Sequence, residues 1–333
     1  LWQALAFYEH KFKTGTTLVT GGQFQDREIT SNDRGNHTVK QVAGFVMINQ
    51  VIANNLFISP AGRVDWDERA GTELVPQINL SWRKGIIQLR GSAGKTIRQA
   101  DFTERYNNYN KAFVPSGSIG NPNLEAERSW SYEAGADVFI EGFKGSVTAF
   151  RRDQQNVIDW VTTPYANMPR KDNLSPMGTY ALASNIAKVN TSGLETDLIY
   201  SKHFNKHHVV TGSAGLVWLD SETNGSTPSF YISSHAKFLT NFALRYENKF
   251  LAVCINGVYK HRKPQEATAI EAEVDADCFM MNGRIDYFLL KNRISLFGEM
   301  DNIADARCGD LLGPQVPGRW LMGGVKIEIG GRK

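Results

Sequence analysis

The chain has 333 residues and a formal net charge of +3 at pH 7, which excludes a strongly basic nucleic-acid-binding protein. Its 30 glycines and 11% aromatic residues favour an aromatic-rich β protein over a disordered chain. No run reaches the roughly 18 consecutive apolar residues of a membrane-spanning helix, so a helical membrane protein is excluded.

From the amino end onward, apolar and polar side chains alternate in many segments. The first segment, LWQALAFYEHKF, lacks an initiator methionine and reads as part of a strand, so we expect a mature or internal piece of a longer protein. The same period of two recurs in QINLSWR, SWSYEAGADVFI, FLTNFALRYE and FMMNGRIDYFL. Each segment is typical of a strand with one apolar wall and one polar wall.

Strand length separates a membrane barrel from a soluble β-sandwich or propeller, which alternation alone does not. A tilted strand needs about 9 to 11 residues to cross a bilayer, and the patterns at 39–53, 188–203 and 250–261 exceed that length. Tight turns such as KTGT, EGFKG and FNKHH alternate with longer polar loops, as they do at the two rims of an outer-membrane barrel. We predict these longer loops at 29–37, 67–72, 99–128, 162–185, 220–235, 264–277 and 307–317. The sequence therefore predicts an all-β, antiparallel transmembrane β-barrel with about fifteen strands, whose apolar wall faces lipid.

Several segments follow one another in an order that is typical of one family: IRQADFTERYNN, GNPNLEAERSWSYEAGADVF, NIAKVNTSGLETDLIY, EMDNIADARCGD and PGRWLMGGVKIEI. Together they resemble successive barrel segments of TonB-dependent outer-membrane receptors. Those proteins are transporters in which the barrel holds an internal plug domain and a periplasmic coupling protein supplies energy. The resemblance covers nearly the whole chain, but only the barrel part of the family.

The resemblance implies that residues 1–330 are the C-terminal part of a transmembrane barrel of about 22 strands, with 331–333 as a tail. The plug domain and the first barrel strands would then lie on a separate N-terminal segment, absent from this chain. An odd number of strands favours the same interpretation, because bacterial single-chain barrels are even-numbered. The final IEIGGRK departs from the family, whose barrels usually finish on an aromatic residue.

By the same resemblance, the protein is an energy-coupled transporter of the bacterial outer membrane. It would import a large scarce nutrient such as an iron-siderophore complex, haem or cobalamin. Its partners would be the TonB energy-coupling protein, outer-membrane lipid and the small-molecule nutrient, with no nucleic acid. A passive or surface-binding barrel and a barrel enzyme are the alternatives. We predict no catalytic residue, no metal site and no cofactor, because the seven histidines are scattered and no phosphate loop or nucleophile elbow is present.

Two long loops are the expected place of ligand binding, because aromatic residues, methionines and amides on adaptable loops can hold a rigid, partly apolar ligand. The candidates are Phe102, Tyr106, Tyr109 and Phe113 in the first loop and Tyr165, Met168, Met177 and Tyr180 in the second. The alternative is that these side chains pack loop against loop and close the mouth of the barrel.

Two carboxylates and three cysteines complete the candidates. Glu195 and Asp197 share a polar wall, where we expect them to face a solvated lumen and pair with basic groups rather than form an active site. Folding the chain across the turn near residue 292 brings Cys278 and Cys308 to the same rim, so we expect a disulfide between them and an unpaired Cys254. Three unpaired thiols are the alternative.

Overall fold

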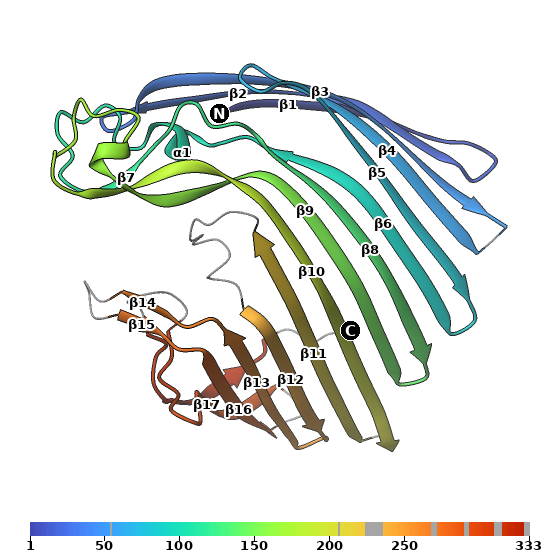
Figure 1. Ribbon diagram of the computed structural model, residues 1–333. Coiled ribbons are helices and arrows are strands. Elements are labelled where there is room, and N and C mark those ends of the chain that lie inside the picture. The colour runs from blue at the N-terminus through green and yellow to red at the C-terminus, as the bar shows by residue number, and fades with distance from the viewer. Residues whose placement is uncertain are drawn as a thin grey trace. The chain divides into compact units, whose positions relative to one another are not determined.

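A computed structural model describes residues 1–53, 55–205, 207–223, 236–267, 272–289, 293–309 and 315–329. These residues form a 16-stranded sheet, in which β7 pairs in parallel with β10 and the other strands follow the order β1-β2-β3-β4-β5-β6-β8-β9-β10-β11-β12-β13-β16-β17-β18 (Figure 1). That order contains fifteen strands, so the predictions of an all-β fold and of about fifteen strands are confirmed. The predicted tail, 331–333, lies outside the described residues.

The strands along this order are long. Their bounds are β1 (Trp2–Lys11), β2 (Thr17–Ser31), β3 (Gly35–Ile52), β4 (Leu56–Asp67), β5 (Gly71–Lys84), β6 (Ile87–Arg98), β8 (Glu127–Ile140), β9 (Phe143–Pro164), β10 (Thr179–Asn205), β11 (His208–Thr223), β12 (Ala236–Glu247), β13 (Leu251–Arg262), β16 (Asp277–Leu289), β17 (Ile294–Asp301) and β18 (Trp320–Ile327). The short elements are α1 (Phe102–Tyr106), β7 (Gly117–Ile119), a 3-10 helix (Tyr165–Asn167), β14 (Gln265–Ala267) and β15 (Ala272–Val274). Among the described residues, no helix is both long enough and apolar enough to cross a membrane.

The chain divides into two compact units, which we describe separately. Unit 1 comprises Leu1–Ala134, Phe150–Ser192 and Ser221–Ile232. Unit 2 comprises Gly135–Ala149, Gly193–Asp220 and Ser233–Lys333.

Two of the predicted long loops are short turns in unit 1. The ladder between β2 and β3 continues to the pair Ser31 and Gly35, and that between β4 and β5 continues to Asp67 and Gly71. Both glycines have a positive φ, of 85° and 77°, which glycine adopts without steric cost. The predictions of loops at 29–37 and 67–72 are therefore wrong in length. Polar residues suggested loops there, but strands that project into water can pair polar residues as well as apolar ones.

In unit 1 the apolar wall of the sheet is the exposed one, which is the reverse of the arrangement in a soluble protein. Along β4 and β5 the apolar side chains are exposed, with fractions of 43% for Trp66, 58% for Leu74 and 41% for Leu80. On the other wall, Asp65 is only 7% exposed and forms an ion pair with Arg63 at 2.7 Å. A soluble sandwich buries its apolar wall, whereas a membrane barrel presents that wall to lipid. The structure therefore favours the membrane barrel that the sequence predicts.

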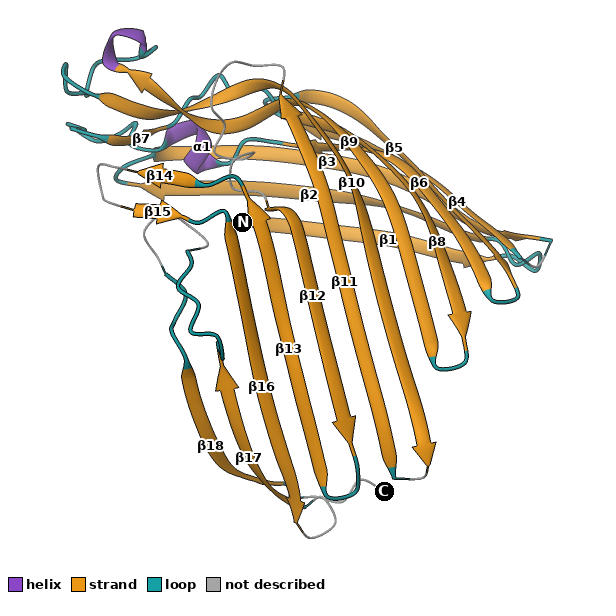
Figure 2. Ribbon diagram, turned by 60° about the horizontal axis from the view of Figure 1, so that its bottom comes forward, coloured by secondary structure: helices purple, strands orange, loops and turns teal. Residues whose placement is uncertain are grey.

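Unit 2 has the same two walls. Phe279 and Tyr287 on β16 are 42% and 48% exposed, in agreement with the predicted lipid-facing wall. On the opposite wall, the guanidinium of Arg284 binds Asp286 at 2.8 Å and Glu299 at 2.7 Å. The short hairpin of β14 and β15 continues beyond the ends of β13 and β16 (Figure 2).

Candidate ligand-binding site

The first long loop of unit 1 begins with the short helix α1, which lies with β7 at one end of this unit (Figure 1). Asp101 caps the helix: its carboxylate accepts the N–H of Glu104 at 2.7 Å, and the carboxylate of Glu104 accepts the N–H of Asp101 at 2.8 Å. The guanidinium of Arg98 binds both Glu104 and Glu127, at 3.0 and 2.6 Å. These contacts fix α1 to the ends of β6 and β8.

Tyr106, the last residue of α1, contacts two other parts of unit 1, namely β3 and the turn between β4 and β5. Its ring stacks on His37 with a centroid distance of 3.5 Å and an interplanar angle of 8°. The guanidinium of Arg69 lies 5.6 Å from the ring centroid. Tyr106 is only 5% exposed, so it holds the loops together in this structure instead of facing solvent.

The turn between β2 and β3 provides a second anchor for the same loop. The backbone N–H of Asn110 donates to the carbonyl of Asp33 at 2.8 Å, and its side-chain amide donates to the carbonyl of Asn32 at 3.2 Å. A hydrogen bond from the hydroxyl of Ser31 lowers the pKa of the Asp33 carboxyl below its usual value, and the charge of Arg34 adds to this effect. The turn is thus held by a carboxylate that stays ionised.

The two long loops also share a buried core. Its buried members are Val114, Ile119, Met168, Leu174, Tyr180 and Leu182. The hydroxyl of Tyr180 accepts the N–H of Ser175 at 2.8 Å and lies 3.1 Å from the carbonyl of Val114, to which it can donate. The side-chain amide of Asn173 donates to the carbonyls of Asn108 and Lys111, at 3.0 and 2.8 Å. We call this joined structure, 99–128 with 162–180, the loop layer.

The structure divides the eight sequence-predicted ligand-binding residues into three groups. The buried ones are Tyr106, Met168 and Tyr180, with exposed fractions of 5%, 4% and 2%. The partly buried ones are Phe102, Tyr109 and Tyr165. The exposed ones are Phe113 at 60% and Met177 at 87%. The alternative of loop-on-loop packing therefore describes the buried group, and the other two groups form the surface that a ligand could reach.

Two basic residues that are not among the sequence-predicted candidates accompany the accessible aromatic rings. The guanidinium of Arg170 lies 4.1 Å from the ring centroid of Tyr109, and the ammonium of Lys171 lies 5.4 Å from that of Tyr165. The adjacent pair of cations in MPRKDN was the available signal. Such pairs can attract a ligand that is both negatively charged and aromatic.

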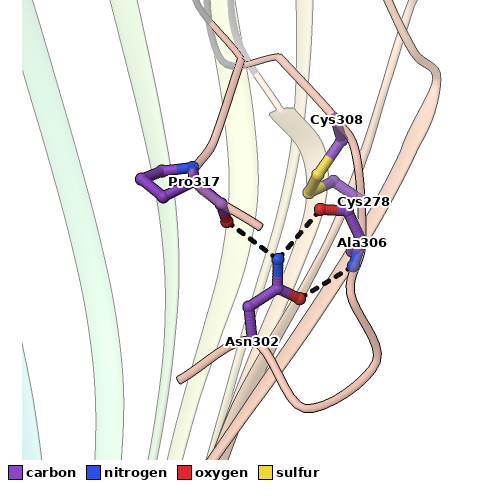
Figure 3. The surroundings of a disulfide bond; sticks show 5 residues. All are labelled: Cys278, Asn302, Ala306, Cys308 and Pro317. Atoms are coloured by element: carbon purple, nitrogen blue, oxygen red, sulfur yellow. Dashed lines mark hydrogen bonds between the residues drawn. A yellow bond between two sulfur atoms is a disulfide. The ribbon is translucent and has the colours of Figure 1, made fainter. Parts of the chain in front are cut away.

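Unit 2 contains the cysteine pair, which the structure joins as a disulfide between Cys278 and Cys308 with Cα atoms 5.8 Å apart (Figure 3). Cys254 is a free cysteine. Beside the disulfide, the side-chain amide of Asn302 donates to the carbonyls of Ala306 and Pro317, at 2.9 and 3.0 Å. The side-chain oxygen of Asn302 accepts the N–H of Ala306 at 2.8 Å.

The predicted pairing of Glu195 and Asp197 with basic groups is not found. Both residues are exposed, and neither lies in an ion pair with a basic residue that the structure describes. Alternation places them on the polar wall of a long strand, where water can solvate a carboxylate without a partner. In the described ranges, no group of three or more His, Cys, Asp and Glu residues could hold a metal ion.

Comparisons with known proteins identify the architecture. A protein-family model described as "TonB dependent receptor-like, beta-barrel" matches residues 2–274. A search of curated protein sequences finds no match. Among solved structures, the siderophore receptor PirA from Pseudomonas aeruginosa is 16% identical, with a TM-score of 0.70 over 98% of this chain and 55% of that one. A variant of the ferric enterobactin receptor PfeA from the same species, in complex with enterobactin, is 16% identical, with a TM-score of 0.71 over 97% and 53% of the two chains. The FrpB iron transporter from Neisseria meningitidis is 13% identical, with a TM-score of 0.71 over 96% and 53%.

At these identities the solved structures show a shared fold, and the chain spans about half of their length. The match to the family model covers most of the chain, and the exposed apolar walls agree with it. The chain therefore belongs to the TonB-dependent receptor-like β-barrel family, whose members lie in the outer membrane of Gram-negative bacteria.

Proposed function

We propose that this chain forms barrel strands of an energy-coupled receptor that imports an iron-siderophore complex across the outer membrane. The family and the names of the structural neighbours, which are siderophore receptors and an iron transporter, support iron-siderophore cargo over haem or cobalamin. Since the chain spans about half of those proteins, the proposal includes a plug domain and the first barrel strands on a further segment. It also includes the TonB protein as the source of energy.

The observation that carries the proposal is the pairing of aromatic rings with cations on the accessible side of the loop layer. Tyr109 with Arg170 and Tyr165 with Lys171 offer both a ring face and a positive charge. The buried core beneath them fixes their backbone, so binding costs little conformational entropy. A rigid, anionic complex with ring systems meets these groups better than a neutral apolar ligand.

Binding by the loop layer is tested with the variants Tyr109→Ala and Arg170→Ala. The purified receptor is titrated with a panel of ferric siderophores, and quenching of its fluorescence reports binding. We expect each variant to weaken binding about tenfold, as for a contact at the centre of an interface. The matched control is Lys144→Ala, because Lys144 lies 5.8 Å from the ring centroid of Phe139 near the short β8–β9 turn. Unchanged affinity in both loop variants would reject the loop layer as the binding surface.

Energy coupling requires a separate measurement. Cells that express the receptor are given the labelled iron complex, with and without an ionophore that collapses the proton-motive force. We expect surface binding in both conditions and uptake only in the energised cells. Uptake that continues without the proton-motive force would indicate a passive barrel, and a cleaved ligand in the medium would indicate an enzyme.

A further inference from the structure

A pocket of about 500 Å³ lies in unit 1 among the turn between β4 and β5, the helix α1 and the segment that follows β7. Its lining includes Arg69, Arg105 and Arg128, and Glu125 is its only acidic residue. None of the eight predicted ligand-binding residues lines it. The pocket is therefore a second feature of the loop layer, apart from the aromatic residues and methionines that are candidates for cargo binding.

Arg105 is buried without a carboxylate partner. It is 4% exposed, and its guanidinium donates to the carbonyl of Pro122 at 2.6 Å. No acidic residue that the structure describes forms an ion pair with it. Burial lowers the pKa of Arg105, and the positive charge of Arg69 lowers it further. The charges of Asp67 and Glu104 act in the opposite direction, but neither carboxylate forms an ion pair with Arg105. A buried cation without a direct counter-ion is costly, so an anion in the pocket would stabilise this arrangement.

The surrounding backbone holds Arg105 in place. The N–H groups of Gly120 and Asn121 donate to the carbonyls of Asn107 and Glu104, at 3.0 and 2.8 Å. A Cβ atom added at Gly120 would lie 2.5 Å from backbone atoms of α1, so this close approach requires glycine. The guanidinium thus has a fixed position beside the pocket, as a binding group requires.

Arg69 and Arg128 reach the same pocket from two other elements. The carboxylate of Asp67 accepts the backbone N–H groups of Arg69 and Ala70, at 2.9 and 3.1 Å, and so fixes the turn that carries Arg69. The guanidinium of Arg69 is in no ion pair with the described acidic residues. Arg128 binds Glu73 at 3.1 Å, but Glu73 also binds Lys95, so one carboxylate serves two cations.

The lining is therefore strongly positive. Glu125 is the one carboxylate on the wall, and its oxygen already accepts a hydrogen bond from the side-chain amide of Asn156 at 2.6 Å. Arginine recognises oxyanions through paired N–H donors, and several arginines together favour a doubly charged oxyanion over a single carboxylate. The volume is in the range of small-molecule sites, so the anion would belong to a larger molecule.

We propose that this pocket binds a phosphate group, held by Arg69, Arg105 and Arg128. The group belongs either to a soluble phosphorylated molecule or to the head group of a lipid, since both present the same oxyanion. This proposal is separate from that of cargo binding, because the pocket shares no lining residue with the candidate cargo-binding residues.

The test uses pyrophosphate as the probe and the purified receptor in a non-ionic detergent, with isothermal titration calorimetry as the measurement. We expect binding that weakens about tenfold or more in Arg69→Gln and in Arg128→Gln, because each removes a charge-assisted contact. Arg69 is exposed, so its variant tests the proposal even if an Arg105→Gln variant fails to fold. The control is Arg151→Gln, an exposed arginine outside the pocket whose side chain is paired with Asp153 at 3.0 Å.

The source of the phosphate is distinguished in nanodiscs of phosphatidylcholine with and without phosphatidic acid. If phosphatidic acid reduces the pyrophosphate affinity of the parent receptor by a larger factor than the residual affinity of Arg69→Gln, the site takes a lipid head group. If pyrophosphate binds equally in both nanodiscs, with the same dependence on Arg69, the site takes a soluble phosphate. Absence of pyrophosphate binding, or equal binding in the parent, Arg69→Gln and Arg128→Gln, overturns the proposal.

Discussion

Asn302 has a left-handed backbone, with φ of 49°, at the point where the chain leaves β17. Asparagine tolerates this conformation better than most residues, because its short polar side chain can bond to nearby backbone. Here the side chain binds Ala306 twice and Pro317 once (Figure 3). One residue therefore supports the backbone geometry and the hydrogen bonds of the segment that leads to Cys308.

Replacing Asn302 by alanine removes all three side-chain hydrogen bonds at a residue that is 5% exposed. We expect Asn302→Ala to lower the free energy of unfolding by about 2 to 4 kcal/mol, because buried backbone groups lose their partners. This change is measured by urea titration of the detergent-solubilised protein. The folded fraction at each urea concentration is read from the heat-modifiable mobility on gels. The control is Asn36→Ala, an exposed asparagine whose side chain makes no hydrogen bond within the described part of the chain. Equal unfolding midpoints for the two variants would contradict the role of Asn302.

Asp33 gives a pH-dependent prediction for the anchor of the loop layer. Its pKa is lowered from the ordinary 3.8 in the folded state, mainly by the hydroxyl of Ser31. A lowered folded-state pKa stabilises the fold above pH 3.8, and this contribution is lost as the pH falls through the lowered value. Ser31→Ala should therefore shift the acid-induced release of the loop to higher pH, because the largest cause of the lowered pKa is removed.

Pulsed hydrogen exchange of residues 106–112, after equilibration at a series of pH values, measures the release. The control is Thr38→Ala. Thr38 is exposed, and its hydroxyl has no hydrogen-bond partner among the residues that the structure describes. A transition at the same pH in Ser31→Ala and in the parent protein would show that Asp33 is not the group that titrates.

At the scale of elements, the loop layer is packed like a small core and not like a set of free loops. Buried clusters lie in it and at the ends of β9 and β10, with members such as Leu124, Ile158 and Ala183. Deleting most of 99–128 would therefore remove core residues as well as the proposed ligand-binding residues. Single substitutions separate these two roles better than deletions do.

Tyr180→Phe tests the rigidity of this layer. The substitution keeps the ring but removes the hydroxyl that accepts from Ser175 and can donate to Val114. We expect a loss of about 1 to 2 kcal/mol of local stability. The loss is limited because the N–H of Ser175 keeps a longer hydrogen bond, at 3.2 Å, to the carbonyl of Val114. Faster hydrogen exchange at 173–178, with unchanged exchange in β3, measures the effect. Tyr165→Phe is the control, since its hydroxyl has no partner in the described residues, and an equal effect of both variants would count against the prediction.

How far the sequence predicts an element depends on whether its structure has a local cause. The alternation in SWSYEAGADVFI results from the two walls of one strand, so β8 could be predicted residue by residue. The burial of Tyr106 and Tyr180 could not, because it results from His37, Arg69 and Val114, which lie far away in sequence. The pocket with Arg105 was missed for the same reason: its arginines come from three separate segments. The strong polarity of 29–37 pointed to a long loop, although the ladder continues through it.

At the scale of the whole molecule, the exposed apolar walls are the property that a membrane must cover. Val64, Leu74 and Ile285 have exposed fractions of 47%, 58% and 52%, and similar side chains recur along most of the described strands. In water such walls would drive aggregation, whereas in a bilayer they face hydrocarbon. The polar walls carry ion pairs such as Arg63 with Asp65, which hydrocarbon would not tolerate.

The orientation of the walls is tested by placing the same charge on either side of one strand. Ile78 lies near the middle of β5 on the apolar wall and is 39% exposed, and its neighbour Asn79 lies on the polar wall. Ile78→Arg should impair insertion, at a cost of about 2 to 4 kcal/mol if the residue lies near the bilayer midplane. Asn79→Arg should insert nearly as well as the parent protein, because its side chain faces water and other polar groups. Both variants are folded into lipid vesicles, and the heat-modifiable fraction on gels measures insertion. Equal insertion of Ile78→Arg and Asn79→Arg, or a loss confined to Asn79→Arg, would show that the walls are assigned to the wrong sides.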